Sequence, residues 1–181
     1  MRALLSWVVV GSAFMLPCFT GAALADHLSI YSDPAFTTCT LTDASPGVVN
    51  VYVTETTYEA TGVRFRIAPS AGFTGVWLSE TSPFVTLGTS LNDLSIVYPA
   101  CAIGTFPVLT VTYQLYGTST CSALDIAPAE GFTLPICAPC AGEGACVGNI
   151  SLHVNCAGSF DCNPLAVEPT TWGSVKALYR N

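Results

Sequence analysis

The chain has 181 residues, of which 51% are hydrophobic and 9% are charged, and its formal net charge is −7. Its five Lys and Arg residues form no patch that could neutralise a row of phosphates, which argues against a nucleic-acid-binding protein. An anionic membrane surface would also repel so acidic a chain. The polar residues are mostly Thr, Ser and Asn, which suit strands better than exposed helix faces, and the length fits one ordinary domain.

The first 25 residues have the layout of a cleavable secretory signal. Arg2 precedes an apolar run from Ala3 to Leu16, and Ala23 and Ala25 occupy the small-residue positions before a cleavage site. We therefore predict cleavage before Asp26, which leaves 4 Lys and Arg against 12 Asp and Glu in the mature chain. The apolar run is too short to span a bilayer, so we expect a secreted protein, extracellular or periplasmic, without a transmembrane segment.

Short runs of alternating apolar residues recur between positions 27 and 155 and predict strands. The clearest is 62–67, where Val63, Phe65 and Ile67 face one side while Arg64 and Arg66 face the other. The other predicted strands are 27–31, 48–53, 75–78, 83–87, 94–98, 107–116, 123–127 and 149–155. Turn residues separate them at 45–47, 69–72, 92–93 and 128–131. About eight short strands indicate an all-β, two-sheet antiparallel sandwich over residues 26–168, with a closed barrel as the alternative.

Nine cysteines become eight once Cys18 is removed with the signal, and an even number in an exported chain predicts a complete set of disulfides. The eight are Cys39, Cys101, Cys121, Cys137, Cys140, Cys146, Cys156 and Cys162. The sequence cannot choose among the many pairings that they allow. We expect Cys39–Cys101 and Cys121–Cys137, with the remaining four closing a Cys-rich loop at 137–162.

The same cluster permits two chemical interpretations. The spacing of Cys137 and Cys140 matches that of thioredoxin-type redox centres, but the Ala-Gly-Glu-Gly-Ala that follows is a poor helix. Zinc would need Cys137, Cys140, Cys146 and either His153 or Cys156 as ligands, and export favours disulfides over free thiolates. A metal-binding domain over 137–156 stays as an alternative function, but we expect no cofactor.

Catalytic groups are sparse. Glu55 and Glu59 are the nearest pair of acids for glycoside hydrolysis, and we expect both to be solvated residues at a strand end. His153 sits inside an alternating strand, where we expect a structural role, and no Gly-x-Ser-x-Gly motif accompanies it. We expect a non-enzymatic protein, with a small secreted hydrolase as the alternative.

Five aromatic residues could either stack on sugar rings along one edge or fill the core of a sandwich: Trp77, Phe84, Tyr98, Tyr113 and Tyr116. We favour the core for most of them and expect Tyr116 to be exposed. A carbohydrate or a cell-surface protein is the partner that such a module would bind.

Residues 169–181 predict a C-terminal tail with helical periodicity. Thr171 is a plausible N-cap, and the residues that share one helical face are Trp172, Val175, Leu178 and Tyr179. An isolated helix of about ten residues is marginal in water, so the tail docks on the sandwich, binds a partner or stays disordered.

The tail has the pattern Trp-Gly-x-x-Lys-x-Leu-Tyr-Arg over residues 172–180. Near the start of the predicted mature chain, Ile-Tyr-Ser-Asp at 30–33 precedes Cys39, and Val-Tyr-Pro-Ala-Cys ends a predicted strand at 97–101. These motifs resemble those of uncharacterised secreted bacterial β-sandwich proteins. The resemblance implies a bacterial origin, and hence no glycosylation at Asn149. The strand pattern is also similar to immunoglobulin-like, cohesin-like and carbohydrate-binding modules, which implies an exported structural, adhesive or ligand-binding module at the cell surface.

Overall fold

The computed structural model describes residues 26–141, 144, 146 and 150–162. All regular structure in this part is β, in the order β1 (His27–Tyr31), β2 (Thr40–Leu41), β3 (Pro46–Pro69), β4 (Val76–Thr81), β5 (Val85–Thr89), β6 (Asp93–Tyr116), β7 (Ser122–Ala127), β8 (Ile136–Ala138) and β9 (Leu152–Val154). The predicted all-β fold is confirmed. The predicted signal and C-terminal helix lie outside the described residues. In the described part, no helix has the length and apolar character needed to cross a membrane.

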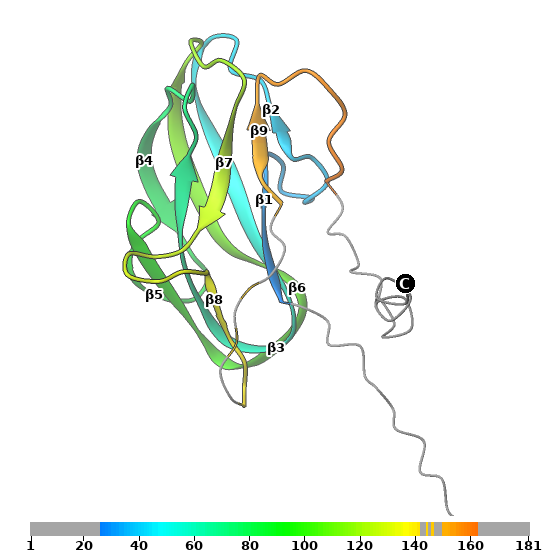
Figure 1. Cartoon of the computed structure of the whole chain (residues 1–181), viewed down its shortest axis with the longest axis vertical. Helices are drawn as coiled ribbons and strands as arrows, with labels where there is room; N and C mark the ends of the chain where they lie inside the picture. The colour runs from blue at the N-terminus through cyan, green and yellow to red at the C-terminus, as the bar shows by residue number, and fades with distance from the viewer. Residues whose placement is uncertain (1–25, 142–143, 145, 147–149, 163–181) are drawn as a thin grey trace, which may run out of the picture.

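Two strands of 24 residues each, β3 and β6, form the frame of the molecule. The sequence predicted four shorter strands in their place, at 48–53, 62–67, 94–98 and 107–116. The two strands stay paired through a common bend, with register shifts after Val53, Thr57 and Ala60. Figure 1 shows the paired ribbon of β3 and β6 curving around at one end of the molecule.

The bend divides β3 and β6 between two layers. The first half of β3 pairs with β1 and with the second half of β6, whose other edge pairs with β4. We call this the first sheet. In the second sheet, the first half of β6 pairs with β5 and with the second half of β3, which in turn pairs with β7 and β8. β9 and then β2 continue beyond β7.

The core lies between these two sheets. The predicted inward residues Val63, Phe65 and Ile67 are all buried, while Arg64 and Arg66 between them face outward. Each fully buried large aliphatic side chain stabilises the fold by about 1.5–3 kcal/mol. Other members of the core, from both sheets, are Leu28, Ile30, Val51, Val53, Leu94, Ile96, Leu109, Val111, Leu124 and Leu152.

The two lateral sides of the sandwich differ. On one side, the backbone of Ile150 bonds to Leu28 and Ile30 of β1, and the chain then continues into β9 in the second sheet. This crossing segment closes that side. On the other side the sheets end in β4 and β5, which residues 82–84 connect. We call it the open side because, in the described part, β4 and β5 each pair with β6 alone (Figure 1).

Four disulfides staple this body: Cys39–Cys162, Cys101–Cys140, Cys121–Cys156 and Cys137–Cys146. The disulfide-stapled sandwich is confirmed, but the expected bonds Cys39–Cys101 and Cys121–Cys137 are wrong, and Cys137–Cys146 alone closes within 137–162. The reason is topological. Cys39 directly precedes β2, whose pairing with β9 brings it to the C-terminal segment, and Cys101 lies on the bend of β6.

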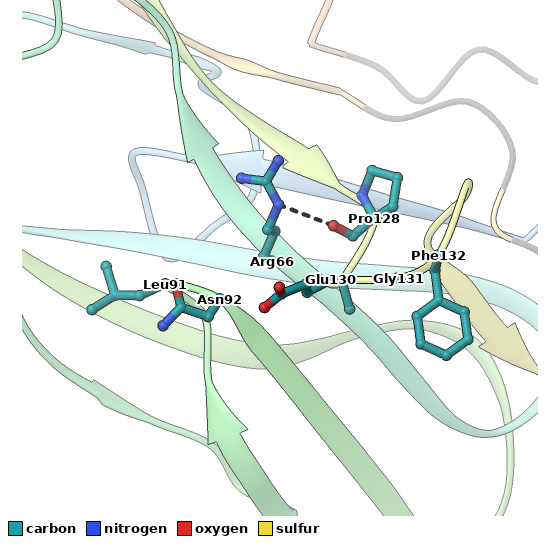
Figure 2. Close-up of a pocket in the computed structure, with 8 residues that line it drawn as sticks. Arg66, Leu91, Asn92, Pro128, Glu130, Gly131 and Phe132 are labelled. Atoms are coloured by element: carbon teal, nitrogen blue, oxygen red, sulfur yellow. Dashed lines mark hydrogen bonds between the residues drawn. The ribbon is translucent and has the colours of Figure 1, made fainter.

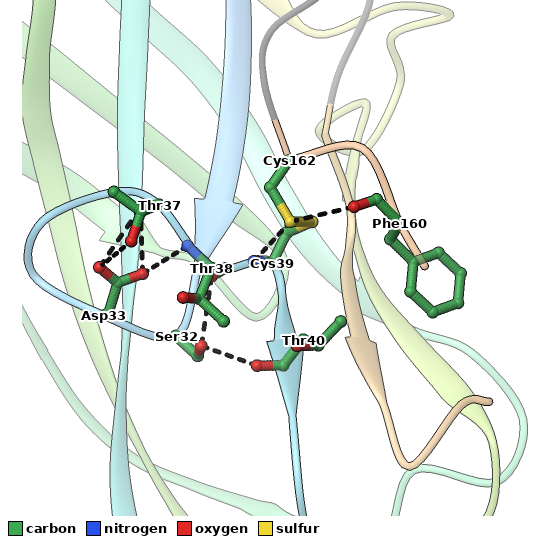
Figure 3. Close-up of a disulfide and its surroundings, with 8 residues drawn as sticks. All are labelled: Ser32, Asp33, Thr37, Thr38, Cys39, Thr40, Phe160 and Cys162. Carbon is green, nitrogen blue, oxygen red and sulfur yellow. Dashed lines mark hydrogen bonds between the residues drawn. A yellow bond between two sulfur atoms is a disulfide. The ribbon is translucent and has the colours of Figure 1, made fainter. Parts of the chain in front are cut away.

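Figure 3 shows the surroundings of the bond between Cys39 and Cys162. The loop before Cys39 is organised by Asp33, whose carboxylate accepts backbone N–H groups of Thr37 and Thr38 at 3.1 and 2.6 Å. Desolvation would raise the pKa of Asp33, but the hydrogen bonds from Thr38 and Thr37 outweigh it and hold that pKa below its ordinary value. Every one of these acceptors is used inside the loop, which therefore has a structural role.

Candidate functional site

The outer surface of the second sheet has an apolar area that continues across several strands. Register places Val85 of β5 opposite Val97 of β6, and Val97 opposite Gly62 of β3. Val85, Leu87 and Val97 are 69%, 67% and 49% exposed, respectively. The neighbouring Ser95, between Leu87 and Arg64 in the register, is small, so the surface stays flat. We call the outward surface formed by residues 62, 64, 85, 87, 95 and 97 the apolar face.

Gly62 allows β3 and β6 to come together under this face. A Cβ atom at this position would lie 2.4 Å from the carbonyl oxygen of Ile96, closer than two such atoms can approach. Any larger residue would push the two strands apart. The glycine at this position therefore allows the backbone of β6 to lie directly against β3.

A charged pair borders the aliphatic residues. The Nε of Arg64 donates to Asp93 at 2.7 Å, and its Nη2 donates to the second carboxylate oxygen. The hydrogen bond from Arg64 holds the pKa of Asp93 below its ordinary value, and the same bond raises the pKa of Arg64. Phe132, from the loop between β7 and β8, lies over the guanidinium with 4.4 Å between Cζ and the ring centroid. Both the ion pair and the ring are accessible to a partner.

Beside this pair is a shallow hollow of about 430 Å³ between the β5–β6 turn and the β7–β8 loop (Figure 2). Leu91 and Phe132 supply its apolar walls, and Asn92 and Glu130 supply polar groups. Arg66 lies along it with its Nε donating to the carbonyl of Pro128 at 3.0 Å. In the described part of this acidic chain, Arg64 and Arg66 are the two cationic side chains, and both belong to this side of the second sheet.

The outer surface of the first sheet is chemically different. Thr112 donates to the side chain of Asn50 at 2.9 Å, and Gln114 donates to the carbonyls of Gly47 and Leu115 at 3.1 and 2.8 Å. The first sheet also exposes Val48 and Val76, at 61% and 49%, but the register sets the hydrogen-bonded Gln114 between them. The second sheet instead offers exposed aliphatic groups directly opposite each other, beside a salt bridge.

The predicted acid pair does not form a catalytic site, because Glu55 is fully buried in the core rather than solvated. The alternation from Val51 and Val53 continues to Glu55 and turns it inward, where it accepts a hydrogen bond from Tyr98. Burial raises the pKa of Glu55 to about 7, against the lowering effect of the Tyr98 hydrogen bond and with a further increase from the charge of Asp26.

Glu59 is separate from Glu55 and lies beside the Cys101–Cys140 disulfide, with its carboxylate within 4.8 Å of both sulfurs. Both sulfurs are covalently bonded, so they are not thiolate ligands. The candidate zinc ligands Cys137, Cys140 and Cys156 are likewise in three different disulfides. The structure therefore does not bring the cluster together as a ligand set.

The remaining predicted residues are placed as follows. Tyr98 and Tyr113 are buried, and Phe84 packs on Tyr98 with ring centroids 4.7 Å apart, so the interpretation of most aromatics as core residues holds. Tyr116 is 48% exposed, as expected. His153 stacks on Phe160 with centroids 3.7 Å apart. The tail residues Trp172, Val175, Leu178 and Tyr179 lie outside the described part.

Sequence reasoning missed the apolar face. One local signal was present, because Ile96-Val97-Tyr98 is an uninterrupted apolar run, and such a run in a strand indicates apolar residues on both surfaces. The position of Val85 and Leu87 beside Val97 depends on strand register, which the sequence does not specify.

No family model and no curated protein matches the chain. Solved structures do. A non-cellulosomal cohesin from the archaeon Archaeoglobus fulgidus is 8% identical, with a TM-score of 0.51 over 72% of this chain and 89% of that one. The seventh ScaB type I cohesin from Pseudobacteroides cellulosolvens is 7% identical, with a TM-score of 0.49 over 77% of this chain and 96% of that one. The described part of the chain thus has a cohesin-like β-sandwich fold. At such low identity the likeness establishes the fold alone.

Proposed function

We propose that this protein is an exported, non-catalytic binding module whose apolar face holds a protein partner. The observation that supports the proposal is the adjacent group Val85, Leu87 and Val97, each at least 49% exposed on a flat sheet surface. Exposed aliphatic groups cost free energy in water, at about 25 cal/mol per Å², and contiguous exposed patches with polar borders are typical of interaction sites.

The chemistry of the face indicates the kind of partner. A complementary surface would place aliphatic or aromatic side chains on Val85 and Val97, and a polar group near the Arg64–Asp93 pair. Arg64 is already compensated by Asp93, so the described cation that could attract an acidic group at the border of the partner is Arg66, whose Nε donates to the carbonyl of Pro128. Such charge complementarity acts chiefly on specificity and on the association rate.

A carbohydrate partner is less well supported. Sugars stack on exposed aromatic rings, and the aromatic residues that could have lined a sugar site are mostly buried here, with Tyr116 an exposed exception. The acid pair Glu55 and Glu59 gives the hydrolase alternative no support, because Glu55 lies in the core and accepts a hydrogen bond from Tyr98. Removal of residues 1–25 and location at the cell surface are part of the proposal. The signal-like layout of those residues supports the first, and the resemblance to secreted β-sandwich proteins supports the second.

The experiment compares two variants of the mature chain, each with one substitution, on opposite sheets. Val97→Asp places a charge at the centre of the apolar face, and Val48→Asp places the same charge on the first sheet, where Val48 is 61% exposed. Each immobilised protein is incubated with the surface and extracellular fractions of the exporting organism. We expect the wild type and Val48→Asp to retain the same partner and Val97→Asp to lose it at least tenfold. Equal retention by both variants, with unchanged melting, would refute the proposal.

A further inference from the structure

Most strand edges in the described part are protected against pairing with another strand. An unpaired edge exposes backbone groups, and proteins protect it with short strands, bulges, charges or covering segments. β1 is covered by Ile150, and β2 and β8 have two and three residues. β4 has a register shift after Trp77 and contains Glu80. Each of these edges is a poor template for a further strand.

β5 has fewer of these protections, and its one departure from extended backbone is at Gly88, near its end, where φ is 83°. Its five residues, Val-Thr-Leu-Gly-Thr, include no charge and no proline, and all five are exposed. It pairs with β6 in unbroken register from Val85 opposite Val97 to Thr89 opposite Asp93, and with no other strand in the described part. It lies at the margin of the second sheet on the open side (Figure 1). A strand of this length and composition can accept a partner strand along its free edge.

We propose that β5 pairs antiparallel with β5 of a second copy of this chain, so that two second sheets join into one continuous sheet. A two-fold axis beside Leu87 places Leu87 opposite its own counterpart and Val85 opposite Thr89 of the second copy. Thr86 then lies opposite Gly88 of the second copy. A contact with two-fold symmetry closes on itself and gives a dimer rather than a filament.

Charge explains why an acidic chain can bind a copy of itself at this edge. The two acidic groups closest to β5 in sequence are already engaged within each copy. Asp93 is paired with Arg64, and Glu80 accepts the backbone N–H of Ser90, 3.1 Å from each carboxylate oxygen. Because β5 itself contains no charged residue, the antiparallel pairing brings no like charges opposite each other. Aliphatic cross-strand pairs such as Leu87 with its counterpart add about 0.2–1 kcal/mol each, so the edge is self-complementary.

Pairing in the plane of the sheet leaves the outward side chains uncovered. Because residues opposite each other in a sheet point to the same side, Val85, Leu87 and Val97 of both copies would form one surface of doubled width. A partner with two binding segments would then gain avidity from the two linked faces. This last consequence rests on the proposed function, whereas the strand pairing does not.

Sedimentation velocity of the mature chain from about 1 µM to about 1 mM tests the pairing, a range that covers weak and moderate dimers. We expect a concentration-dependent dimer. Leu87→Lys sets two ammonium groups opposite each other and should raise the dissociation constant at least tenfold. Val48→Lys, the same change at a similarly exposed residue of the first sheet, should leave it unchanged. A chain that stays monomeric throughout, or a Leu87→Lys variant that dimerises like the wild type, overturns the proposal.

Hydrogen exchange of the unmodified chain provides a measurement that does not depend on how a variant folds. Amides of residues 84–89 should become more protected as concentration rises, and those of β4 should not. Protection that increases on another segment instead would overturn the pairing. Val97→Asp separates the two proposals, because it should abolish partner capture and leave dimerisation intact. A wild-type chain that captures its partner but stays monomeric would refute the strand pairing and leave the proposed binding face intact.

Discussion

Glu55 illustrates how far the environment of a side chain can differ from its neighbourhood in the sequence. Thr54, Thr56 and Thr57 surround it in the chain and suggest a solvated strand end, yet its side chain is 0% exposed. One carboxyl oxygen accepts from Tyr98, and the other is buried without a hydrogen-bond partner among the described residues. Its position follows from inward alternation on a strand that pairs on both edges, which local composition does not reveal.

The buried carboxyl makes stability depend on pH. Since burial raises the pKa of Glu55 to about 7, the group is neutral in the fold at mildly acidic pH and must be ionised in the core above that value. In the unfolded chain it ionises near pH 4.5, so its stabilising effect is full below about pH 4.5 and is lost as pH rises through 7. We expect the wild type to lose about 3 kcal/mol of unfolding free energy between pH 4.5 and pH 8 from this group.

Denaturant unfolding across this pH range checks the expectation. Glu55→Gln removes the titrating group and should flatten the profile, so that the variant gains relative to the wild type at pH 8. Glu59→Gln, on the same strand, is the matched control and should keep the wild-type slope. A Glu55→Gln profile parallel to that of the wild type would contradict the assignment.

Gly62 and Gly47 form a natural comparison on one strand. Gly62→Ala should destabilise the protein by about 1–3 kcal/mol, because the new Cβ would lie 2.4 Å from the carbonyl oxygen of Ile96. Gly47→Ala meets no atom within 4 Å and should leave stability nearly unchanged. Thermal unfolding of the two variants measures the difference, and equal effects would show that the strands can separate at no cost.

At the scale of elements, alternation in the sequence located strands well and their continuity poorly. The segments 48–53 and 62–67 are both strand, but they belong to one element. Residues 54–61 contain four Thr and a Tyr, which favour strands, so the join could have been predicted. For β6 it could not, because Pro99, Gly104 and Pro107 all read as breaks, and Gly104 adopts a φ of 96° within the strand.

The disulfides differ in how much chain they enclose, and this predicts their relative effects. Cys39–Cys162 spans 123 residues and Cys137–Cys146 spans 9. By loop-closure entropy, replacing the first pair with Ala should cost about 5 kcal/mol and the second about 3 kcal/mol. Denaturant titration of the two double variants checks the order. A larger loss for Cys137→Ala/Cys146→Ala would mean that packing of the buried sulfurs outweighs chain entropy.

At the scale of the whole molecule, composition, alternation and an even number of cysteines were sufficient to predict a disulfide-stapled all-β body. They could not predict which surface is available for binding. The apolar face comes from Val85, Val97 and Gly62 lying side by side, and these residues belong to three strand segments that only tertiary pairing brings together. The predicted cysteine pairs were wrong for the same reason, since the pairing depends on where β2 and the bend of β6 lie.

Deletion of the C-terminal tail tests whether attachment to the surface and partner binding belong to different parts of the chain. We expect deletion of residues 170–181 to alter surface attachment or stability and to leave partner capture by the apolar face unchanged, because every residue of that face belongs to β3, β5 and β6. Cell fractionation, melting and the capture assay together measure this. Lost capture in the shortened chain would place the tail in the binding surface.

The bond between Cys39 and Cys162 has a mechanical consequence. It joins a residue close to the start of the sandwich to the last described residue before the tail, at a sequence separation of 123, and so bypasses residues 40–161. A force that pulls the two ends of the exported chain apart would be transmitted through β1, the loop at 32–38 and this single covalent link. β2 to β9 lie outside this covalent path, so such a module could be stretched between two anchored ends while its apolar face kept its shape.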